Sequence, residues 1–202
     1  VSHAQHEYDE PSVDMVSERI GTNTYYIKGN AGTAFDSEGF ISTAGFVVTS
    51  DGVVVYDSLG TPPLANKMLS LIREITAQPI KLVVVSHYHP DHIYGLQVFK
   101  DAGAEIWAPK GSMNYFLSDN AATLLEERMI SLYPYVNEET RMIVPDRIIT
   151  KDLEFSMGTT DFKIHMHGAV HSDGDMSLLN LDDKALFTGD LIYEGRIPYV
   201  GH

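Results

Sequence analysis

The chain has no cysteine, few basic residues and no long apolar run. The lack of cysteine excludes disulfide bonds, thiolate metal sites and cysteine nucleophiles, so any bound metal must be held by nitrogen and oxygen atoms. The chain has only 14 Lys and Arg but 28 Asp and Glu, which gives a formal charge of −14. This charge opposes binding to nucleic acids and anionic membranes, which require a cationic surface. No segment approaches the roughly 18 apolar residues of a membrane span, and no signal segment opens the chain. The composition predicts a soluble protein, or the mature form of a secreted one.

Strand patterns occupy both ends of the chain and helical patterns occupy the middle. β-Branched and aromatic runs predict strands at 24–29, 45–49 and 53–57, the last two joined by a turn. Helical spacing begins after Thr61, and its packed face is predicted to comprise Leu64, Met68, Leu71, Ile72 and Ile75. The predicted order continues with a buried strand at 81–87, a helix at 91–103, a strand at 105–108, helical structure at 109–133, and strands at 147–150, 153–157, 162–167, 176–181 and 184–189. This alternation predicts an α/β fold with mixed sheets.

Two segments have no regular pattern. Residues 1–12 are polar, so we expect a flexible tail in which His3 and His6 are solvated, followed by a single domain at 13–202. Residues 29–42 are rich in glycine but lack the spacing of a phosphate-binding loop, which predicts a mobile loop.

Four potential metal ligands follow the buried strand within the stretch VVVSHYHPDHIYG. His87 and His89 alternate along the chain, so both side chains can point to one side, and Pro90 forces a turn that brings Asp91 and His92 toward the same point. Imidazole nitrogen together with carboxylate oxygen suits zinc. The density of ligands at the end of a buried strand predicts a metal site, in preference to a hydrogen-bonded turn.

Two other features have simpler interpretations. The stretch FKIHMHG repeats the His-X-His spacing at His165 and His167, and here we favour one face of a strand over a metal site. Serine-based catalysis is the competing chemistry, but the chain has no GxSxG motif. Ser86 is therefore interpreted as a residue at the end of a strand.

The stretch HYHPDH resembles the HxHxDH motif of the metallo-β-lactamase superfamily, and three further stretches resemble its other motifs in order. GAVHSDGD places His171 at the family's third histidine, LFTGDL places Asp190 at its bridging carboxylate, and VVVYDS places Asp57 at its early aspartate. The resemblance extends from about Val13 to the end of the chain. It implies an αββα sandwich of two mixed sheets flanked by helices.

The resemblance also implies roles for individual residues. His87, His89 and His171 are expected to form a first zinc site, Asp91 and His92 a second, and Asp190 a bridge between them. Asp91 is also the expected catalytic residue, and Asp57 either supports the metal loop or belongs to a simple turn. In this sequence Val170 replaces the glycine that usually precedes the third histidine.

The residues that follow the HYHPDH motif resemble those of the SoxH-like branch, or quinoprotein relay system metallohydrolases, whose members are generally exported. His92, where the largest group of true β-lactamases has arginine, also separates the chain from that group. The family's last histidine, a ligand of the second site, has no counterpart before His202, which we do not assign to that role. The expectation is a truncated chain that lacks the last elements of the fold and has a weak second site.

A zinc ion lowers the pKa of a bound water to about 7 and so supplies hydroxide for attack on a carbonyl. We therefore expect a zinc-dependent hydrolase of a small β-lactam, ester or thioester, with Phe35, Phe40 and Tyr94 shaping its pocket. The alternatives are a glyoxalase II-like thioesterase, a di-iron redox protein and a non-catalytic metal-binding accessory protein. The expected location is the periplasm or the exterior, or else the cytoplasm.

Overall fold

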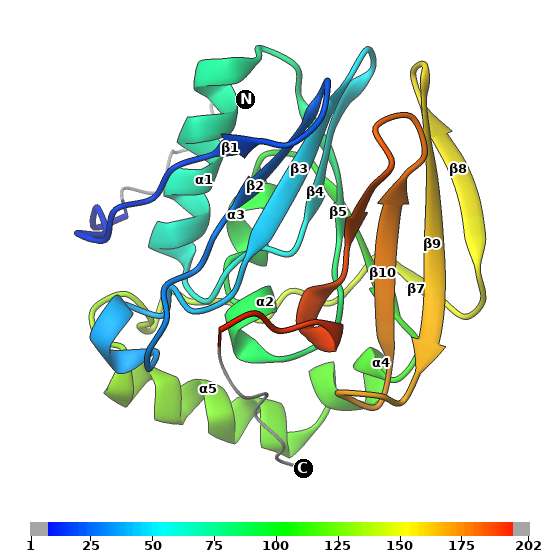
Figure 1. Ribbon diagram of the computed structural model, residues 1–202. Helices are drawn as coiled ribbons and strands as arrows, with labels where there is room; N and C mark the ends of the chain where they lie inside the picture. Colours follow the sequence, from blue (N-terminus) through cyan, green and yellow to red (C-terminus); the bar gives the residue numbers. More distant parts are fainter. Residues whose placement is uncertain (1–7, 196–202) are drawn as a thin grey trace.

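The strands up to residue 149 form one large sheet in the computed structural model, which describes residues 8–195 (Figure 1). The sheet has seven strands in the order β1-β2-β3-β4-β5-β6-β7. The first four strands pair in antiparallel fashion and the last four in parallel, so the sheet is mixed as predicted. Its strands are β1 (Glu18–Arg19), β2 (Thr24–Ile27), β3 (Ala44–Thr49), β4 (Gly52–Tyr56), β5 (Ile80–Val84), β6 (Glu105–Pro109) and β7 (Arg147–Ile149).

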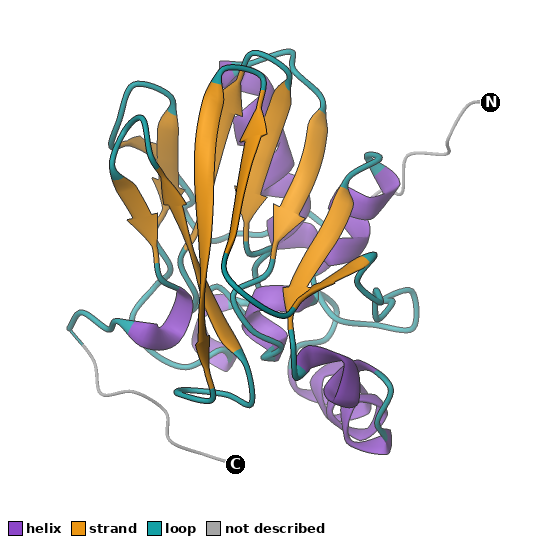
Figure 2. Cartoon of the chain, turned by 90° about the vertical axis from the view of Figure 1, so that its right-hand side faces the viewer, coloured by secondary structure: helices purple, strands orange, loops and turns teal. Residues whose placement is uncertain are grey.

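The later strands form a second sheet of four strands in the order β11-β10-β9-β8. Its members are β8 (Leu153–Met157), β9 (Thr160–Gly168), β10 (Asp175–Asn180) and β11 (Ala185–Phe187). Within the described part of the chain all of its pairings are antiparallel, so this sheet is not mixed. Figures 1 and 2 show it packed face to face with the larger sheet.

Alternating side chains of the large sheet supply two hydrophobic cores. Val53 and Val55 of β4 face a core shared with the helices, whereas Val54 and Tyr56 face a core shared with the second sheet. Burial on both faces explains why β4 and β5 have nearly continuous apolar sequences. The predicted arrangement of two sheets flanked by helices is confirmed. Along residues 8–195, however, no helix covers the outer face of the second sheet (Figure 2).

The helix after Thr61 forms as predicted. Helix α1 (Pro62–Ile75) begins with two prolines, and the Thr61 hydroxyl accepts a hydrogen bond from the Leu64 amide at 3.4 Å. Leu64, Met68 and Ile72 are buried, but Ile75 is 37% exposed, so the buried face is narrower than predicted.

The helix predicted at 91–103 is divided into α2 (Pro90–Ile93) and α3 (Leu96–Asp101). At the break lies Gly95, where a Cβ atom would come within 1.9 Å of the Ser58 carbonyl oxygen. The predicted helical region at 109–133 is likewise divided, into α4 (Ser112–Phe116) and α5 (Asp119–Ser131). There the Ser118 hydroxyl accepts a hydrogen bond from the Ala121 amide and begins the second helix.

The N-terminal segment contacts the rest of the protein from Tyr8 onward. Residues 1–7 lie outside the described part, but the Tyr8 hydroxyl already accepts a hydrogen bond from the Gln97 amide at 3.0 Å. The Lys67 ammonium donates to the Pro11 carbonyl at 3.2 Å, and Pro11 is buried. Contacts with the rest of the protein thus include residues before Val13. None of the helices between residues 8 and 195 has the length and hydrophobicity needed to span a lipid bilayer.

Asp183 lies in the connection between β10 and β11 and joins the two sheets. Figure 1 shows this connection at the end of the sheets remote from α2. The Asp183 carboxylate accepts hydrogen bonds from the Thr22 amide at 2.8 Å, the Asn23 amide at 3.0 Å and the Thr24 hydroxyl at 2.6 Å. Burial raises the pKa of Asp183, but these hydrogen bonds outweigh that effect and lower its pKa to about 2. The ionised form therefore stabilises the folded state.

Asp183→Ala is expected to lower the free energy of unfolding at pH 6 by roughly 1 kcal/mol, since it removes these hydrogen bonds. The folded-state pKa lies below the unfolded value of about 3.9, so this stabilisation is complete above pH 4 and disappears as the pH falls through 2. Urea denaturation of both proteins between pH 6 and pH 2 measures it, with Asp182→Ala as the neighbouring control. A difference that stays constant down to pH 2 contradicts this assignment.

Candidate metal centre

His87 and His89 follow β5 and lie at the edge where the parallel strands end. His87 is fully buried, and its Nδ1 atom lies 2.9 Å from the Ser86 hydroxyl. This contact occupies one ring nitrogen and leaves the other, Nε2, facing His89. The end of a rigid, buried strand therefore fixes the direction of the first imidazole.

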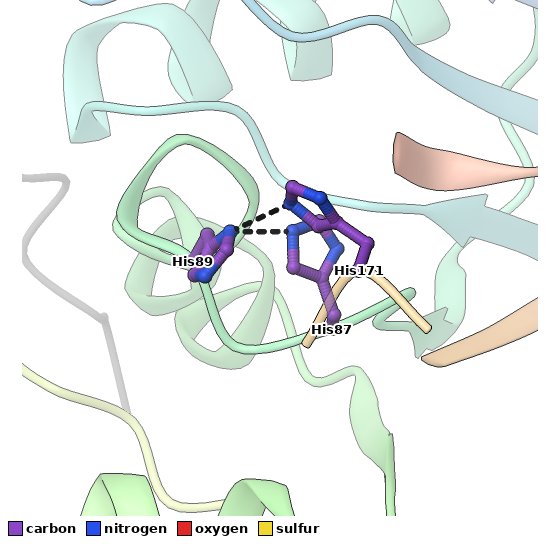
Figure 3. A group of neighbouring side chains, drawn as sticks. All are labelled: His87, His89 and His171. Carbon is purple, nitrogen blue, oxygen red and sulfur yellow. Dashed lines mark hydrogen bonds between the residues drawn. The ribbon is translucent and has the colours of Figure 1, made fainter. Parts of the chain in front are cut away.

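Three imidazole nitrogens meet at one point (Figure 3). The Nδ1 atom of His89 lies 3.0 Å from Nε2 of His87 and 3.0 Å from Nε2 of His171. His171 comes from the other sheet, on the loop between β9 and β10. A neutral imidazole carries one N–H, so His89 Nδ1 cannot form good hydrogen bonds to both neighbours through its single lone pair or proton. A cation between the three nitrogens would use all three lone pairs at once.

A second group lies beside the first and contains His92. Its Nδ1 atom lies 2.8 Å from the Asp57 carboxylate, and its Nε2 atom lies 3.1 Å from Asp190 Oδ1 and 3.5 Å from Asp91 Oδ2. Nε2 is buried but makes no hydrogen bond of acceptable geometry. A buried nitrogen of this kind, facing two carboxylates, is suited to a metal ligand.

Asp190 lies between the two groups, in the 3-10 helix η2 (Gly189–Leu191) that follows β11. Its Oδ1 atom faces His92, while its Oδ2 atom lies 3.4 Å from Nε2 of His171. The Tyr193 hydroxyl donates a hydrogen bond to Oδ2 at 2.6 Å. The two oxygens of one carboxylate thus face the two histidine groups separately.

Asp57 combines the two roles considered for it. Its backbone has a φ of 62°, as in a tight turn, and its side chain is fully buried. The carboxylate accepts hydrogen bonds from the Ser86 amide at 2.7 Å and the Ser86 hydroxyl at 2.8 Å, in addition to its contact with His92. Asp57 therefore orients His92 of the second group and also Ser86, the residue that precedes His87.

Burial and charge set the protonation of the two groups differently. Burial lowers the pKa of His87 well below its usual value, and burial together with His171 lowers the pKa of His89. Burial also lowers the pKa of His92, but Asp91, Asp57 and Asp190 outweigh it and raise the pKa well above its usual value. For Asp190 burial raises the pKa, but His92 outweighs it and lowers the pKa. Burial thus favours the neutral rings of His87 and His89, whereas in the second group the charge of His92 is balanced by the carboxylates around it.

The structure brings some of the predicted histidines and carboxylates together as possible metal ligands and places the other histidines elsewhere. His87, His89 and His171 form one cluster of possible metal ligands, and His87, His92 and Asp190 form another, with Asp91 beside His92. His165 and His167 instead lie on the outer face of β9, where they contact Asp152 at 3.4 Å and Ser177 at 2.8 Å. His202 lies outside the described residues.

The predicted pocket residues are partly wrong. Phe40 and Tyr94 are 0% and 1% exposed and belong to the core beneath the helices, so neither offers surface to a substrate. Phe35, in the 3-10 helix η1 (Phe35–Ser37), is 78% exposed. Hydrophobicity alone could not distinguish a core side chain from one at the surface of a loop.

Three supporting residues were missed by the sequence analysis. Ser86 contacts both Asp57 and His87, Tyr193 contacts Asp190, and Asp175 accepts hydrogen bonds from the His171 loop. Ser86 and Asp175 lie one and four residues from a predicted ligand. That proximity is the signal that could have drawn attention to them.

The family model for the Metallo-beta-lactamase superfamily matches residues 38–202. The chain therefore belongs to this superfamily, whose members typically bind metal ions. This agrees with the nitrogen and oxygen donors present, which suit zinc without any thiolate.

Curated relatives include the acyl-coenzyme A thioesterase MBLAC2 of Gallus gallus, 31% identical over 130 residues that cover 58% of this chain and 45% of that protein. The metallo-beta-lactamase type 2 of Elizabethkingia meningoseptica is 24% identical over 96% of this chain and 68% of its own length. This chain thus matches less than half of MBLAC2. Among solved structures, the metallo-beta-lactamase of Pontibacter korlensis has the same fold, with a TM-score of 0.68 and 18% identity over 94% of this chain and 77% of that one.

Asp57→Ala is expected to lower the free energy of unfolding by about 2 to 4 kcal/mol, because the buried donors of Ser86 and His92 lose their acceptor. Asp57→Asn is expected to lose less, since asparagine keeps an oxygen and tolerates positive φ. Urea denaturation measures both. Asp51→Ala is the control, because Asp51 forms an exposed ion pair with Lys81 that contributes less than about 1 kcal/mol. Equal losses in Asp57→Ala and Asp51→Ala contradict the role given to Asp57.

Proposed function

We propose that the protein is a zinc-dependent hydrolase of small carbonyl compounds, with a centre for two metal ions. The observation that carries the proposal is the convergence of three imidazole nitrogens beside a second group that shares Asp190 with them. In this proposal His87, His89 and His171 would hold the first ion, and Asp91 with His92 would hold the second. Asp190, whose two oxygens face the two groups, would belong to both sites.

Zinc in such a site lowers the pKa of water and polarises a carbonyl oxygen. The residues of this chain contribute orientation and proton transfer. Asp91 has 22% of its side chain exposed, whereas His92 beside it is buried, so Asp91 can reach both the centre and solvent. We assign Asp91 the acceptance of a proton from the attacking water and its transfer toward the leaving group. Asp57 holds the His92 ring through Nδ1, which keeps Nε2 directed at the centre.

The relatives support a carbonyl substrate without defining it. MBLAC2 is an acyl-coenzyme A thioesterase, and GloC of Haemophilus influenzae, 25% identical over 66% of this chain, is a hydroxyacylglutathione hydrolase. These names favour a thioester, and the similarity to a metallo-beta-lactamase favours a β-lactam amide. A sulfate ester is the second candidate, because a linear primary-alkylsulfatase of Pseudomonas is 37% identical over 49 residues.

Two further parts of the proposal concern the chain as a whole. We propose that the residues from Val13 onward belong to one domain, since the two cores lie on opposite faces of a single sheet. The resemblance to the SoxH-like branch supports action in the periplasm or outside the cell.

Metal content tests the centre directly. The purified chain is expected to retain zinc, and His89→Ala is expected to bind it at least about tenfold more weakly, because one of three converging nitrogens is lost. His165→Ala is the matched control, since His165 belongs to a second His-X-His pair on the outer face of β9. Atomic absorption and competition with a chromogenic chelator measure both. Near two iron ions per chain with a visible absorption band would replace the proposal with a di-iron redox protein.

Activity is tested with a panel of a chromogenic cephalosporin, a glutathione thioester, an acyl-coenzyme A and an alkyl sulfate. At least one carbonyl compound is expected to turn over, and His87→Ala and Asp91→Ala are expected to reduce kcat/KM about 100-fold or more. The His165→Ala protein should match the wild type. Metal binding without turnover of any compound would instead indicate a non-catalytic metal-binding protein.

A further inference from the structure

The loop between β9 and β10 must hold His171 accurately, although it lies outside regular structure. His171 is the member of the first group that comes from the second sheet, so its position depends on how this loop is fixed. A metal ligand has to be held within about 0.5 Å of its working position. The residues that fix the loop are therefore as important as the ligand.

One carboxylate gathers the amides of this loop. Oδ2 of Asp175, the first residue of β10, accepts hydrogen bonds from the backbone amides of Val170 at 3.0 Å, His171 at 2.8 Å and Ser172 at 2.9 Å. Oδ1 accepts a fourth from the Ser172 hydroxyl at 3.0 Å. Three successive amides directed at one anion fix the backbone on both sides of His171.

Among the described residues, the carboxylate of Asp175 accepts hydrogen bonds from its own loop and pairs with no basic side chain. The residue is 2% exposed, and no basic side chain within residues 8–195 forms an ion pair with it. A buried carboxylate is costly unless hydrogen bonds compensate it, so release of the loop would leave Asp175 unsatisfied. The free energy of this one side chain is thus coupled to the conformation of the His171 loop.

The next residue connects the loop to the other histidines. The Met176 amide donates to the Ser86 carbonyl at 3.0 Å, and the Tyr56 hydroxyl donates to the Met176 carbonyl at 2.8 Å. Ser86 immediately precedes His87. Asp175 and Met176 together therefore place the His171 loop against the end of β5.

Gly174 brings the same loop against the turn after β6. A Cβ atom at this position would come within 1.8 Å of the Lys110 carbonyl oxygen. The loop is therefore supported on two sides, by β5 through Met176 and by the turn through Gly174.

We propose that Asp175 is a positioning residue that sets His171 relative to His87 and His89, and so determines the affinity of the first metal site. This inference rests on the proposed metal centre. It assigns Asp175 no contact with the metal or the substrate. Its effect is transmitted through the amides of residues 170–172.

Asp175→Ala in the full 202-residue chain is expected to weaken zinc binding by about 10- to 100-fold, as residues that orient metal ligands commonly do. Asp183→Ala is the matched control, because Asp183 also accepts two backbone amides and a hydroxyl, but at the opposite end of the sheets. It is expected to lose stability and to keep its zinc affinity within twofold. Competition with a chromogenic chelator gives the affinities, and the absorption spectrum of the Co²⁺ form reports the ligand geometry.

The experiment distinguishes failure of the inference about Asp175 from failure of the proposed function. Wild-type affinity and an unchanged Co²⁺ spectrum in Asp175→Ala overturn the inference, and equal losses in Asp175→Ala and Asp183→Ala reduce Asp175 to a general stabilising residue and overturn it as well. Failure of the wild-type chain to bind zinc overturns the proposed function instead.

If Asp175→Ala does not fold, Asp175→Asn decides the question. Asparagine retains an accepting oxygen but loses the charge, which about halves the strength of each hydrogen bond. A loss of about threefold or more in zinc affinity supports the inference, and no loss overturns it.

Discussion

The hydrogen bond between the Met176 amide and the Ser86 carbonyl is the contact on which the centre depends. It joins the start of β10 to the end of β5, one residue before His87, and the buried Tyr56 hydroxyl reinforces it from within the core between the sheets. Each sheet alone supplies an incomplete set of ligands. The first group needs His171 from one sheet and His87 from the other, so sheet packing and ligand geometry are set by the same contact.

Buried carboxylates that accept several hydrogen bonds complete the arrangement. Asp57 and Asp175 each accept several hydrogen bonds, mainly from amides and hydroxyls. Asp57 orients the His92 ring, and Asp175 fixes the loop that carries His171. These hydrogen bonds occupy the backbone and, in His92, one ring nitrogen. The Nε2 atom of His92 is left buried without a partner, which costs stability in the metal-free protein and favours a cation. The residues that could hold a metal ion are thus arranged by local hydrogen bonds in this chain.

Local sequence patterns predicted the buried strands correctly. They failed where contacts between residues distant in the sequence determine the structure. The strands β4 and β5 were predicted from nearly continuous apolar runs, and β9 from the alternation of its apolar residues. The break at Gly95 was missed because its cause is the Ser58 carbonyl, which lies far away in the sequence. For the same reason Phe40 and Tyr94 were placed at the pocket, although both pack inside the core.

Residue type and spacing near a strand end are local properties, so the chemistry of the donors and their order along the chain could be predicted from the sequence. It identified His87, His89, Asp91, His92 and more distant partners as a set. The ring nitrogen with which each histidine faces the centre, and the direction of the two oxygens of Asp190 toward different groups, could not be predicted in this way. Those features depend on the packing of two sheets, and the direction of a side chain is fixed only when its neighbours from the other sheet are in place.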